Sequence, residues 1–376
     1  MTTIGILGGG QLAQMTLQAA ISLGLETVIF ERFADSPAAR FTPNAIVADW
    51  QDRAALQRFA DLCDVATLEN EFVDAEVLAS LEASGLPIYP TSSTLTLVQD
   101  KFWQKNRIAD EAIPVPAYRA VESPDDVLEA GQEFGWPLVL KTRRDGYDGY
   151  GNATLHSAAD LADAWNKLAA SGRKLMVEQF VPFERELAVI VVRGRDGSLA
   201  AYPVVETVQQ NHICHVVRAP APILTGVQFE ARRLACAAVE AVQGIGVFGI
   251  ELFLLPDGRL LFNEMAPRPH NSGHYTIEAC ETSQFENHLR AIMGWPLGSV
   301  EMVAPAAVMV NLLGQRTGGV ENSAIREALR VSGAQIHLYG KRDVRPGRKM
   351  GHITVLGKTL QEAETVAQRA ANAVRL

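Results

Sequence analysis

The sequence has little basic charge, and it has no apolar run long enough to span a membrane. Its 376 residues include 34 lysines and arginines against 43 aspartates and glutamates, which gives a formal net charge of −9. Because a nucleic-acid backbone is bound by a broad basic surface, this balance argues against a nucleic-acid partner. The chain also starts without a basic segment followed by a long apolar one. We therefore expect neither an export signal nor a membrane partner.

Cysteine is scarce as well. The four cysteines, at positions 63, 214, 236 and 280, lack the paired spacing of a metal site. Scattered cysteines in a chain of this length are typical of reduced thiols, so we expect a cytoplasmic protein. The hydrophobic fraction of 48% and the charged fraction of 20% are those of an ordinary globular protein, and the length predicts two or three domains.

The first hundred residues predict a parallel sheet. They read as a short apolar strand at 3–7, a Gly-Gly-Gly turn, a helix at 11–23 and a second strand at 27–30. The Gly-x-Gly-x-x-Ala pattern that starts at Gly8, together with Glu31, matches a dinucleotide-binding fingerprint. An NAD-dependent oxidoreductase is therefore one alternative. Any helix that starts behind a glycine turn can, however, hold a phosphate or a carboxylate.

A polar loop follows another strand of this sheet. Residues 64–68 and 87–89 read as further parallel strands, and Glu-Asn-Glu at 69–71 comes directly after the first of them. Ligands of open parallel sheets bind at the carboxyl ends of the strands. This loop is therefore a candidate binding segment.

A second unit carries a glycine-rich flap. A helix is expected at 100–111 and a strand at 138–141 that ends in Lys141, after which three glycines alternate with polar residues through 145–152. The strand resumes at 153–155. Backbone N–H groups of such a flap can approach phosphates closely. A plain flexible β-turn is the alternative, but a lysine just upstream favours the phosphate interpretation.

Two carboxylates are expected to face each other on a hairpin. Apolar segments flank Asp257 and Gly258, the preferred pair for a two-residue turn with positive φ at both positions. In that register, opposite residues have numbers that sum to 515, so Glu251 faces Glu264. Their Cβ atoms would lie about 5 Å apart, and the carboxylates would repel unless a cation such as Mg²⁺ lies between them. A solvated sheet edge is the alternative. A metal role for Asn263 requires a bulge, because alternation points it to the other face.

Two further segments concentrate polar chemistry. Residues 263–276 bring carboxylate, amide, guanidinium, imidazole and hydroxyl groups together directly after the hairpin, which is typical of a site for an anion and a metal. Residues 341–349 hold five cations, and glycines at 347 and 351 bracket the last two. A solvated charged loop is one interpretation, and capture of a discrete phosphate is the other. Around these segments we expect a strand at 306–312, a helix at 323–331, a strand at 353–356 and a C-terminal helix.

Taken in order, these pieces resemble the ATP-grasp superfamily, and within it the ligases that act on ribonucleotide amines in purine biosynthesis. The resemblance covers nearly the whole chain and is most specific in the Pro-Arg-Pro-His-Asn-Ser-Gly-His segment at 267–274. The fold class that it implies is α/β, an ATP-grasp protein with an N-terminal parallel-sheet, Rossmann-like pre-ATP-grasp domain. The implied domains are an N-terminal βαβ domain at 1–100, a lid subdomain at 101–183 and a C-terminal α+β domain at 184–376, which includes a small subdomain from about 305.

The resemblance also implies the chemistry. The substrates would be ATP, bicarbonate and 5-aminoimidazole ribonucleotide, with carboxyphosphate as the intermediate and Mg²⁺ as the cofactor. The enzyme would act as a cytoplasmic homodimer. A ligase for another ribonucleotide amine, such as one that adds formate to glycinamide ribonucleotide, is the nearest alternative, and a catalytically silent ATP-binding module is another.

The site residues follow by position from the resemblance. The catalytic candidates are Arg268, His270, Lys349 and Tyr147, and the metal ligands are Glu251, Glu264 and Asn263. The substrate-binding set is Gln11, Leu12, Glu71, Tyr147, Arg268, His270, Asn271, Ser272, Lys341, Arg348 and Lys349. The ATP-binding set is Lys101, Lys141, Gly146, Tyr147, Asp148, Gly149, Tyr150, Gly151, Asn152, Glu178, Gln179, Phe180, Val181, Glu186, Asn263 and Glu264, with Gln209 or His212 at the place of a family histidine.

Overall fold

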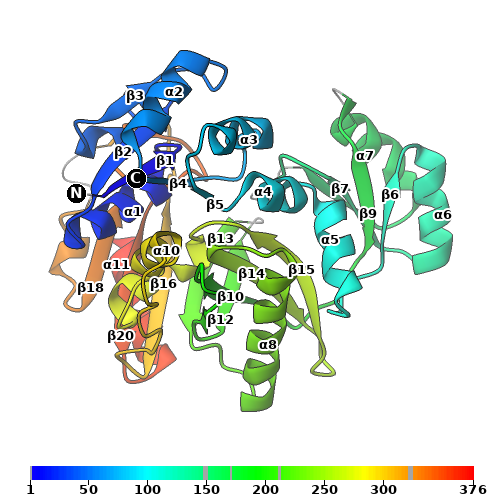
Figure 1. Cartoon of the computed structure of the whole chain (residues 1–376). Coiled ribbons are helices and arrows are strands. Elements are labelled where there is room, and N and C mark those ends of the chain that lie inside the picture. The colour runs from blue at the N-terminus through cyan, green and yellow to red at the C-terminus, as the bar shows by residue number, and fades with distance from the viewer. Residues whose placement is uncertain (1, 147–150, 170–171, 211–212, 321–324) are drawn as a thin grey trace.

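The computed structural model describes residues 2–146, 151–169, 172–210, 213–320 and 325–376. Three sheets organise the molecule (Figure 1). A parallel sheet lies at the N-terminal end, a small antiparallel sheet forms a separate lobe, and a large antiparallel sheet runs through the rest of the chain. No helix in these ranges is long and apolar enough to cross a membrane.

The N-terminal sheet is parallel, as expected. Its strands stand in the order β3-β2-β1-β4-β5. The central strands are apolar over almost their whole length because helices cover both faces. The strands are β1 (Thr3–Leu7), β2 (Glu26–Glu31), β3 (Ala45–Val47), β4 (Val65–Leu68) and β5 (Ile88–Tyr89), and the helices are α1 (Gln11–Ser22), α2 (Arg53–Leu62), α3 (Ala75–Ala83) and α4 (Ser92–Gln99).

The smaller sheet forms the lobe on the right of Figure 1. Its antiparallel order is β6-β9-β7-β8. Alternate residues of β7 are buried, so one face of the sheet packs on the helices of the lobe. The elements are α5 (Lys101–Asp110), β6 (Tyr118–Val121), α6 (Pro124–Phe134), β7 (Leu138–Thr142), β8 (Asn152–Leu155), α7 (Leu161–Leu168) and β9 (Leu175–Gln179).

The large sheet has nine strands in the order β15-β14-β10-β12-β13-β16-β20-β18, with β11 paired to β10. Helix α8 packs against one part of it and α11 against another. The register shifts at three places, next to Glu251, Gln209 and Leu313. The strands are β10 (Arg185–Arg193), β11 (Leu199–Ala201), β12 (Val205–Gln210), β13 (Ile213–Ala219), β14 (Gly246–Leu254), β15 (Leu260–Ala266), β16 (Ala306–Leu313), β18 (Ala334–Leu338) and β20 (Lys349–Gly357), and the helices are α8 (Thr225–Ala241), α9 (Thr276–Ala279) and α11 (Leu360–Asn372). A two-stranded ladder, β17 (Gly318–Gly319) with β19 (Asp343–Val344), lies outside it.

Helix α10 (Gln284–Met293) joins the N-terminal sheet to the large one. Leu289 and Ile292 pack among the apolar residues of β1 and α1. Between them and the helix start, buried His288 accepts a hydrogen bond from the backbone N–H of Val247 on β14, at 3.0 Å. Its Nε2 lies 2.7 Å from the hydroxyl of Thr67 on β4. One helix therefore links the sheets by both apolar packing and hydrogen bonds.

Most of the expected elements are confirmed, and the boundaries differ by few residues. Near the C-terminus one expectation is wrong, and one expected strand is present but longer. The helix expected at 323–331 is, in the part of it that the structure describes, only the 3₁₀ turn Ala328–Arg330. The strand expected at 353–356 begins earlier, at Lys349. Pairing with β16 extends this strand through Gly351 and His352, because their backbone groups find partners there.

The hairpin brings Glu251 and Glu264 opposite each other as expected, but its turn differs from the expected one. Gly258 has φ +86° and Asp257 does not have positive φ, so the turn is a three-residue loop and the pairs beside it sum to 514. A bulge between Glu251 and Leu252 then adds one residue, Asn263, on β15. Beyond that bulge the pairs sum to 515, and Glu251 faces Glu264. The two-residue turn was wrong, whereas the facing acids and the bulge are confirmed.

Candidate active site

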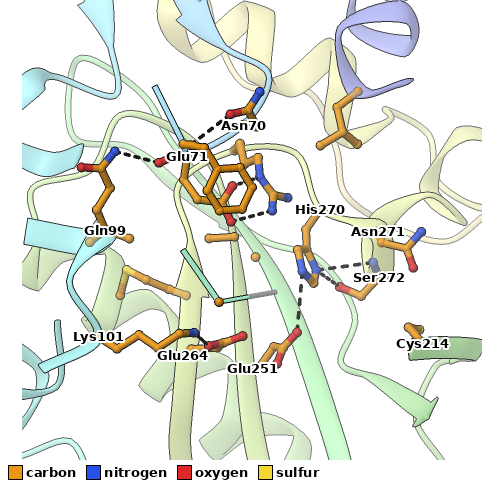
Figure 2. Close-up of a pocket in the computed structure, with 18 of the residues that line it drawn as sticks. Asn70, Glu71, Gln99, Lys101, Cys214, Glu251, Glu264, His270, Asn271 and Ser272 are labelled. Atoms are coloured by element: carbon orange, nitrogen blue, oxygen red, sulfur yellow. Dashed lines mark hydrogen bonds and ion pairs between the residues drawn. The ribbon is translucent and has the colours of Figure 1, made fainter. Parts of the chain in front are cut away.

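A cleft of about 750 Å³ opens where the lobes meet. Segments from the N-terminal sheet, the lobe of the smaller sheet and the large sheet all line it. Figure 2 shows Lys101 reaching toward Glu264, with Glu251 beside it, Asn70 and Glu71 at the opposite edge, and the His270 ring between them and directed at Glu251. Residues that are far apart in the sequence thus form one polar cavity.

The cleft gathers most of the candidates. The site residues from the sequence that line it are Gln11, Leu12, Glu71, Lys101, Gly146, Asn152, Glu186, Gln209, Glu251, Glu264, Arg268, His270, Asn271, Ser272 and Lys349. The candidates outside its lining are Lys141, Gly151, Glu178, Gln179, Phe180, Val181, Asn263, Lys341 and Arg348. Tyr147, Asp148, Gly149, Tyr150 and His212 lie outside the described residues.

The facing carboxylates on β14 and β15 have a lysine beside them. The Lys101 ammonium is in direct contact with the Glu264 carboxylate. Burial opposes ionisation of Glu264, but the ammonium groups of Lys101 and Lys141 outweigh it and lower the pKa of this carboxyl. Burial, with the charge of Glu264, raises the pKa of Glu251. Two effects therefore relieve the repulsion expected between the two acids. The Lys101 ammonium stabilises the charged form of Glu264, and the raised pKa of Glu251 favours its protonated form.

The bulge residue completes a set of oxygen donors. The Asn263 amide nitrogen lies 3.3 Å from a Glu251 oxygen, while its buried carbonyl oxygen has no hydrogen-bond partner. Two carboxylates and an amide carbonyl are the ligands that Mg²⁺ takes, with phosphate oxygens and water at the remaining positions. In the described ranges no group of three or more His, Cys, Asp or Glu side chains could hold a metal by itself. These residues therefore fit a hard cation that a phosphate ligand helps to hold.

Behind this pair lies a second set of charges, in which Glu178 and Lys105 are buried and Lys141 is partly buried. Glu178 on β9 contacts Lys141, at 2.8 Å, and Lys105, at 3.4 Å. Burial opposes ionisation of Glu178, but Lys105 and Lys141 outweigh it and lower its pKa. Burial lowers the pKa of Lys105 to about 8, and its ammonium donates to the backbone carbonyl of Asn263 at 2.9 Å. Glu178 thus lies between two lysines, and the exposed Phe180 follows it at the strand end.

A second cation–acid pair occupies the other side of the cleft. Arg268 contacts Glu71 through two nitrogens, Nε and Nη2, with the Nη2 bond at 2.8 Å. Burial opposes ionisation of Glu71, but Arg268 outweighs it and lowers the pKa of this carboxyl. Gln99 donates to the Glu71 carbonyl at 2.7 Å and so fixes the loop. The loop at 69–71 and the Pro-Arg-Pro-His segment, about 200 residues apart, therefore meet as one unit.

His270 is held as a neutral ring with a defined tautomer. The Ser272 backbone N–H donates to His270 Nδ1 at 3.4 Å, so that nitrogen carries no proton and Nε2 does. Nε2 lies 3.6 Å from a Glu251 oxygen. Burial, together with the charges of Arg268 and Lys349, lowers the pKa of His270 to about 4. The ring therefore offers an N–H donor to an anion in the cleft.

The glycine turn at the start of α1 is already occupied by acids of the chain. The Glu31 carboxylate accepts from the Gly9 backbone N–H at 2.8 Å. At Gly10, an added Cβ would lie 2.2 Å from a Glu69 oxygen, and Glu69 also accepts from the Leu12 N–H at 3.4 Å. The helix start binds carboxylates, as the fingerprint allowed, but the place of a dinucleotide pyrophosphate is filled by Glu69.

The cationic loop at 341–349 contributes one residue to the cleft lining, Lys349. The Lys341 ammonium donates to the Lys349 carbonyl at 2.8 Å and lies over the Tyr339 ring. Arg348 donates to the Asp343 carbonyl at 2.8 Å. Lys341 and Arg348 therefore shape the loop, whereas Lys349 lines the cavity itself.

Sequence reasoning missed several residues at or behind the cleft. Lys105 and Gln104 lie on α5, next to the motif residue Lys101, but nothing in their spacing marks them. Both are buried by contacts with β15, a strand about 160 residues away. Glu69 carried a usable signal, since it opens the polar loop at a strand end.

Three family models match the chain in order. They are a ribonucleotide synthetase preATP-grasp domain at residues 1–99, an ATP-grasp domain at 106–285 and a phosphoribosylaminoimidazole carboxylase C-terminal domain at 307–366. The three sheets described above are thus those of an ATP-grasp protein with an N-terminal pre-ATP-grasp domain.

Known proteins resemble the chain over nearly its full length. The phosphoribosylaminoimidazole carboxylase of Schizosaccharomyces pombe is 42% identical over 96% of this chain, which spans 66% of that longer protein. The N5-carboxyaminoimidazole ribonucleotide synthase of Mycobacterium bovis is 41% identical over 98% of this chain and 87% of its own length. A crystal structure of the Aspergillus clavatus synthase with ADP and 5-aminoimidazole ribonucleotide has a TM-score of 0.91 at 38% identity, and covers 99% of this chain and 98% of that one.

Proposed function

This chain belongs to the N5-carboxyaminoimidazole ribonucleotide synthase family of ATP-grasp ligases, and we propose that it carboxylates 5-aminoimidazole ribonucleotide with ATP and bicarbonate. The observation that carries the proposal is the two-sided cleft. Lys101 and the facing acids form one side, and Arg268, Glu71, His270 and Lys349 form the other. A single cavity with two charged sides suits a reaction that brings two anionic nucleotides together, one on each side.

The proposed reaction has two steps. An oxygen of bicarbonate attacks the γ-phosphorus of ATP, the bond to the β-phosphate oxygen breaks, and carboxyphosphate and ADP form. The exocyclic amine of the ribonucleotide then attacks the carboxyl carbon, the carbon–oxygen bond to phosphate breaks, and the amine loses a proton. Phosphate leaves, and the carbamate nucleotide remains. Catalysis of this kind rests on positioning and on neutralising charge.

Each half of the cleft has a role in these steps. Lys101 and Lys141 would hold the ATP phosphates once they exchange their present partners, Glu264 and Glu178. Glu251, Glu264 and Asn263 would hold Mg²⁺, which neutralises phosphate charge during phosphoryl transfer. The Nε2–H of His270, which lies 3.6 Å from a Glu251 oxygen, would donate to an oxygen of the carboxyl group that is transferred. Arg268 and Lys349 would bind the ribonucleotide.

An ADP-release assay with omitted substrates tests the proposal. ADP should form when bicarbonate and 5-aminoimidazole ribonucleotide are both present, and radiolabelled bicarbonate should appear in an acid-labile nucleotide product. ADP formation with formate and glycinamide ribonucleotide, and not with these substrates, would assign the cleft to the alternative ligase. Reduction of a substrate by NADH would instead support the oxidoreductase. Size-exclusion chromatography with light scattering tests the homodimer that we propose as the cytoplasmic form.

A further inference from the structure

Two buried glutamines contact the segment that carries the acids and the imidazole. Gln104 lies on α5 and is 2% exposed, and Gln284 is the first residue of α10 and is fully buried. Neither belongs to a motif of the resemblance. Each touches the backbone of the 264–274 segment, in which β15 ends and the polar loop begins.

The two contacts have the same geometry. The Gln104 side chain accepts from the Met265 N–H at 3.0 Å and donates to the Met265 carbonyl at 3.1 Å. The Gln284 side chain accepts from the His270 N–H at 2.9 Å and donates to the His270 carbonyl at 2.8 Å. A side-chain amide that bonds both groups of one residue reproduces the pairing that a neighbouring strand would supply. Each glutamine thus replaces a missing strand at one residue.

The segment needs such partners because regular pairing stops there. Strand β15 is the edge of the large sheet, so one side of it has no strand. After Ala266, prolines at 267 and 269 lack backbone N–H groups and cannot continue a ladder. Buried backbone groups on this stretch would otherwise be unpaired. Met265 follows the metal-side acid Glu264 directly, and His270 itself carries the imidazole of the substrate side.

The fit around Gln284 is tight. An added Cβ at Gly273 would lie 2.5 Å from the Gln284 carbonyl oxygen, so the loop closes directly on this amide. The Gln284 backbone N–H donates to the Thr276 hydroxyl at 2.9 Å, and its side-chain nitrogen lies 3.3 Å from His274 Nδ1. Because α10 is anchored between two sheets, Gln284 ties His270 to a helix that is held from both sides.

From these contacts we propose that Gln104 and Gln284 are positioning residues for the two halves of the cleft. Gln104 sets Glu264 for the nucleotide and its metal, and Gln284 sets His270, Asn271 and Ser272 for the ribonucleotide. The assignment of the halves rests on the proposed function. The positioning itself rests on the contacts alone.

The test compares Gln104→Leu with Gln284→Leu at similar volume. Each removes the two bonds to the segment, together with the bond of Gln104 to the Val98 carbonyl or of Gln284 to His274. Gln284→Leu should raise the KM for 5-aminoimidazole ribonucleotide and lower kcat, for a combined loss of about 10- to 100-fold in kcat/KM, because misplacement by about 1 Å costs that much. Its KM for ATP should change by less than about twofold. Gln104→Leu should show the reverse, with a higher KM for ATP and a higher Mg²⁺ requirement.

Asn287→Leu is the matched control. Asn287 is fully buried on the same helix and bonds the Gly298 N–H, the Gly298 carbonyl and the Tyr202 hydroxyl, so it holds a different loop. Asn287→Leu should lower the Tm, and it should not change the KM for ATP and the KM for 5-aminoimidazole ribonucleotide by different factors. If either glutamine variant fails to fold, Gln→Glu at the same position keeps the acceptor and removes the donor. Equal proportional losses for both substrates in both variants would reduce the glutamines to general structural roles and overturn the proposal.

Amide hydrogen exchange provides a readout that does not need activity. Gln284→Leu should accelerate exchange at the His270 amide and not at the Met265 amide, and Gln104→Leu should do the opposite. Unchanged exchange at both amides would overturn the positioning. Inactive wild-type protein with the expected exchange pattern would count against the proposed function alone.

Discussion

Three cations at or beside the cleft have acid partners before any substrate binds. Lys101 contacts Glu264, Lys141 contacts Glu178, and Arg268 contacts Glu71. A phosphate that enters must therefore exchange with a carboxylate, and the displaced carboxylate needs a new cation. A divalent metal beside Glu264 would meet this requirement on the nucleotide side.

Glu264→Gln should abolish turnover and leave the fold intact. The change removes a charge that both Lys101 and a metal need, while the amide keeps the shape of the side chain. ADP release measures turnover, and circular dichroism with the Tm checks the fold. Near-normal ADP formation at saturating Mg²⁺ would exclude the paired-carboxylate site.

Lys349→Ala should raise the KM for 5-aminoimidazole ribonucleotide about 10- to 150-fold, because a charge-assisted contact contributes roughly 1.5 to 3 kcal/mol. Lys349 lines the cleft, whereas Arg348 donates to the Asp343 carbonyl outside its lining. Arg348→Ala should therefore have the smaller effect. Steady-state kinetics at fixed ATP separates the two variants. A larger effect at Arg348 would place the ribonucleotide phosphate on the outer part of the loop.

Some of these residues could be predicted from the sequence and some could not. Glu251 and Glu264 face each other because of local hairpin pairing. The three-residue turn shifts the pairing by one residue relative to the expected turn, and the bulge at Asn263 shifts it back by one, so the prediction was right although the turn was wrong. The contacts of Lys105 and Gln104 could not be predicted, since they join α5 to β15 through tertiary packing. Spacing along the chain carries no information on such contacts.

Among the structural elements, the glycine-rich flap has a constrained base. Gly151 has φ +88°, and an added Cβ would lie 2.5 Å from the Thr142 hydroxyl oxygen. The Gly151 carbonyl also accepts from the Thr142 N–H at 2.7 Å. The base therefore needs both the left-handed backbone and the missing side chain. The flap tip, at 147–150, lies outside the described residues.

Gly151→Ala should raise the KM for ATP several-fold, because the clash with Thr142 displaces the flap base beside Gly146 and Asn152. Gly85→Ala is the control, since Gly85 has φ +96° with no atom within 4 Å of the added Cβ. Both variants should lose about 1 to 2 kcal/mol of stability to backbone strain. Kinetics and thermal unfolding separate the effects. Equal KM values for ATP in the two variants would show that the base of the flap does not affect nucleotide binding.

One element near the C-terminus could not be predicted from the local sequence pattern. A helix was expected at 323–331, yet the structure has a 3₁₀ turn at Ala328–Arg330. Helix propensity is a weak preference that tertiary context overrides. Here Ala328 is buried, its turn packs against α11 and β18, and this packing holds the short turn in place.

At the scale of the whole molecule, helix α10 and its neutral His288 connect the N-terminal sheet to the large sheet. The Thr67 hydroxyl donates to the Tyr89 carbonyl, so it must accept from His288 Nε2, and Nδ1 accepts from the Val247 N–H. A second proton on the ring would oppose the Val247 N–H. Burial accordingly lowers the pKa of His288 to about 4.

Lowering the pH should therefore weaken the connection between these two sheets. Between about pH 6.5 and pH 4 the unfolded chain binds a proton at His288 that the folded chain does not, so stability is lost as the pH falls. His288→Gln should reduce the slope of unfolding free energy against pH by at most about 1.4 kcal/mol per pH unit in this window. Urea unfolding of the variant and the wild type at several pH values measures the difference in slope. Identical slopes would show that His288 does not contribute to the acid sensitivity.

The three register shifts of the large sheet have a common consequence for its curvature. Strands β15 and β20 are six neighbours apart, so a flat sheet would separate them by roughly 29 Å. Yet Glu264 from β15 and Lys349 from β20 line the same cleft. The sheet must therefore curl around the cavity, and bulges are the usual means of bending a sheet.

Each shift falls beside a residue that lines the cleft. One lies at Glu251, one at Gln209, and one where Leu313 pairs with Lys349. The irregularities that bend the sheet are thus the same ones that aim these side chains inward. If regular pairing were restored at any of the three positions, the sheet would curve less. Glu251 and Glu264 would then lie farther from Lys349.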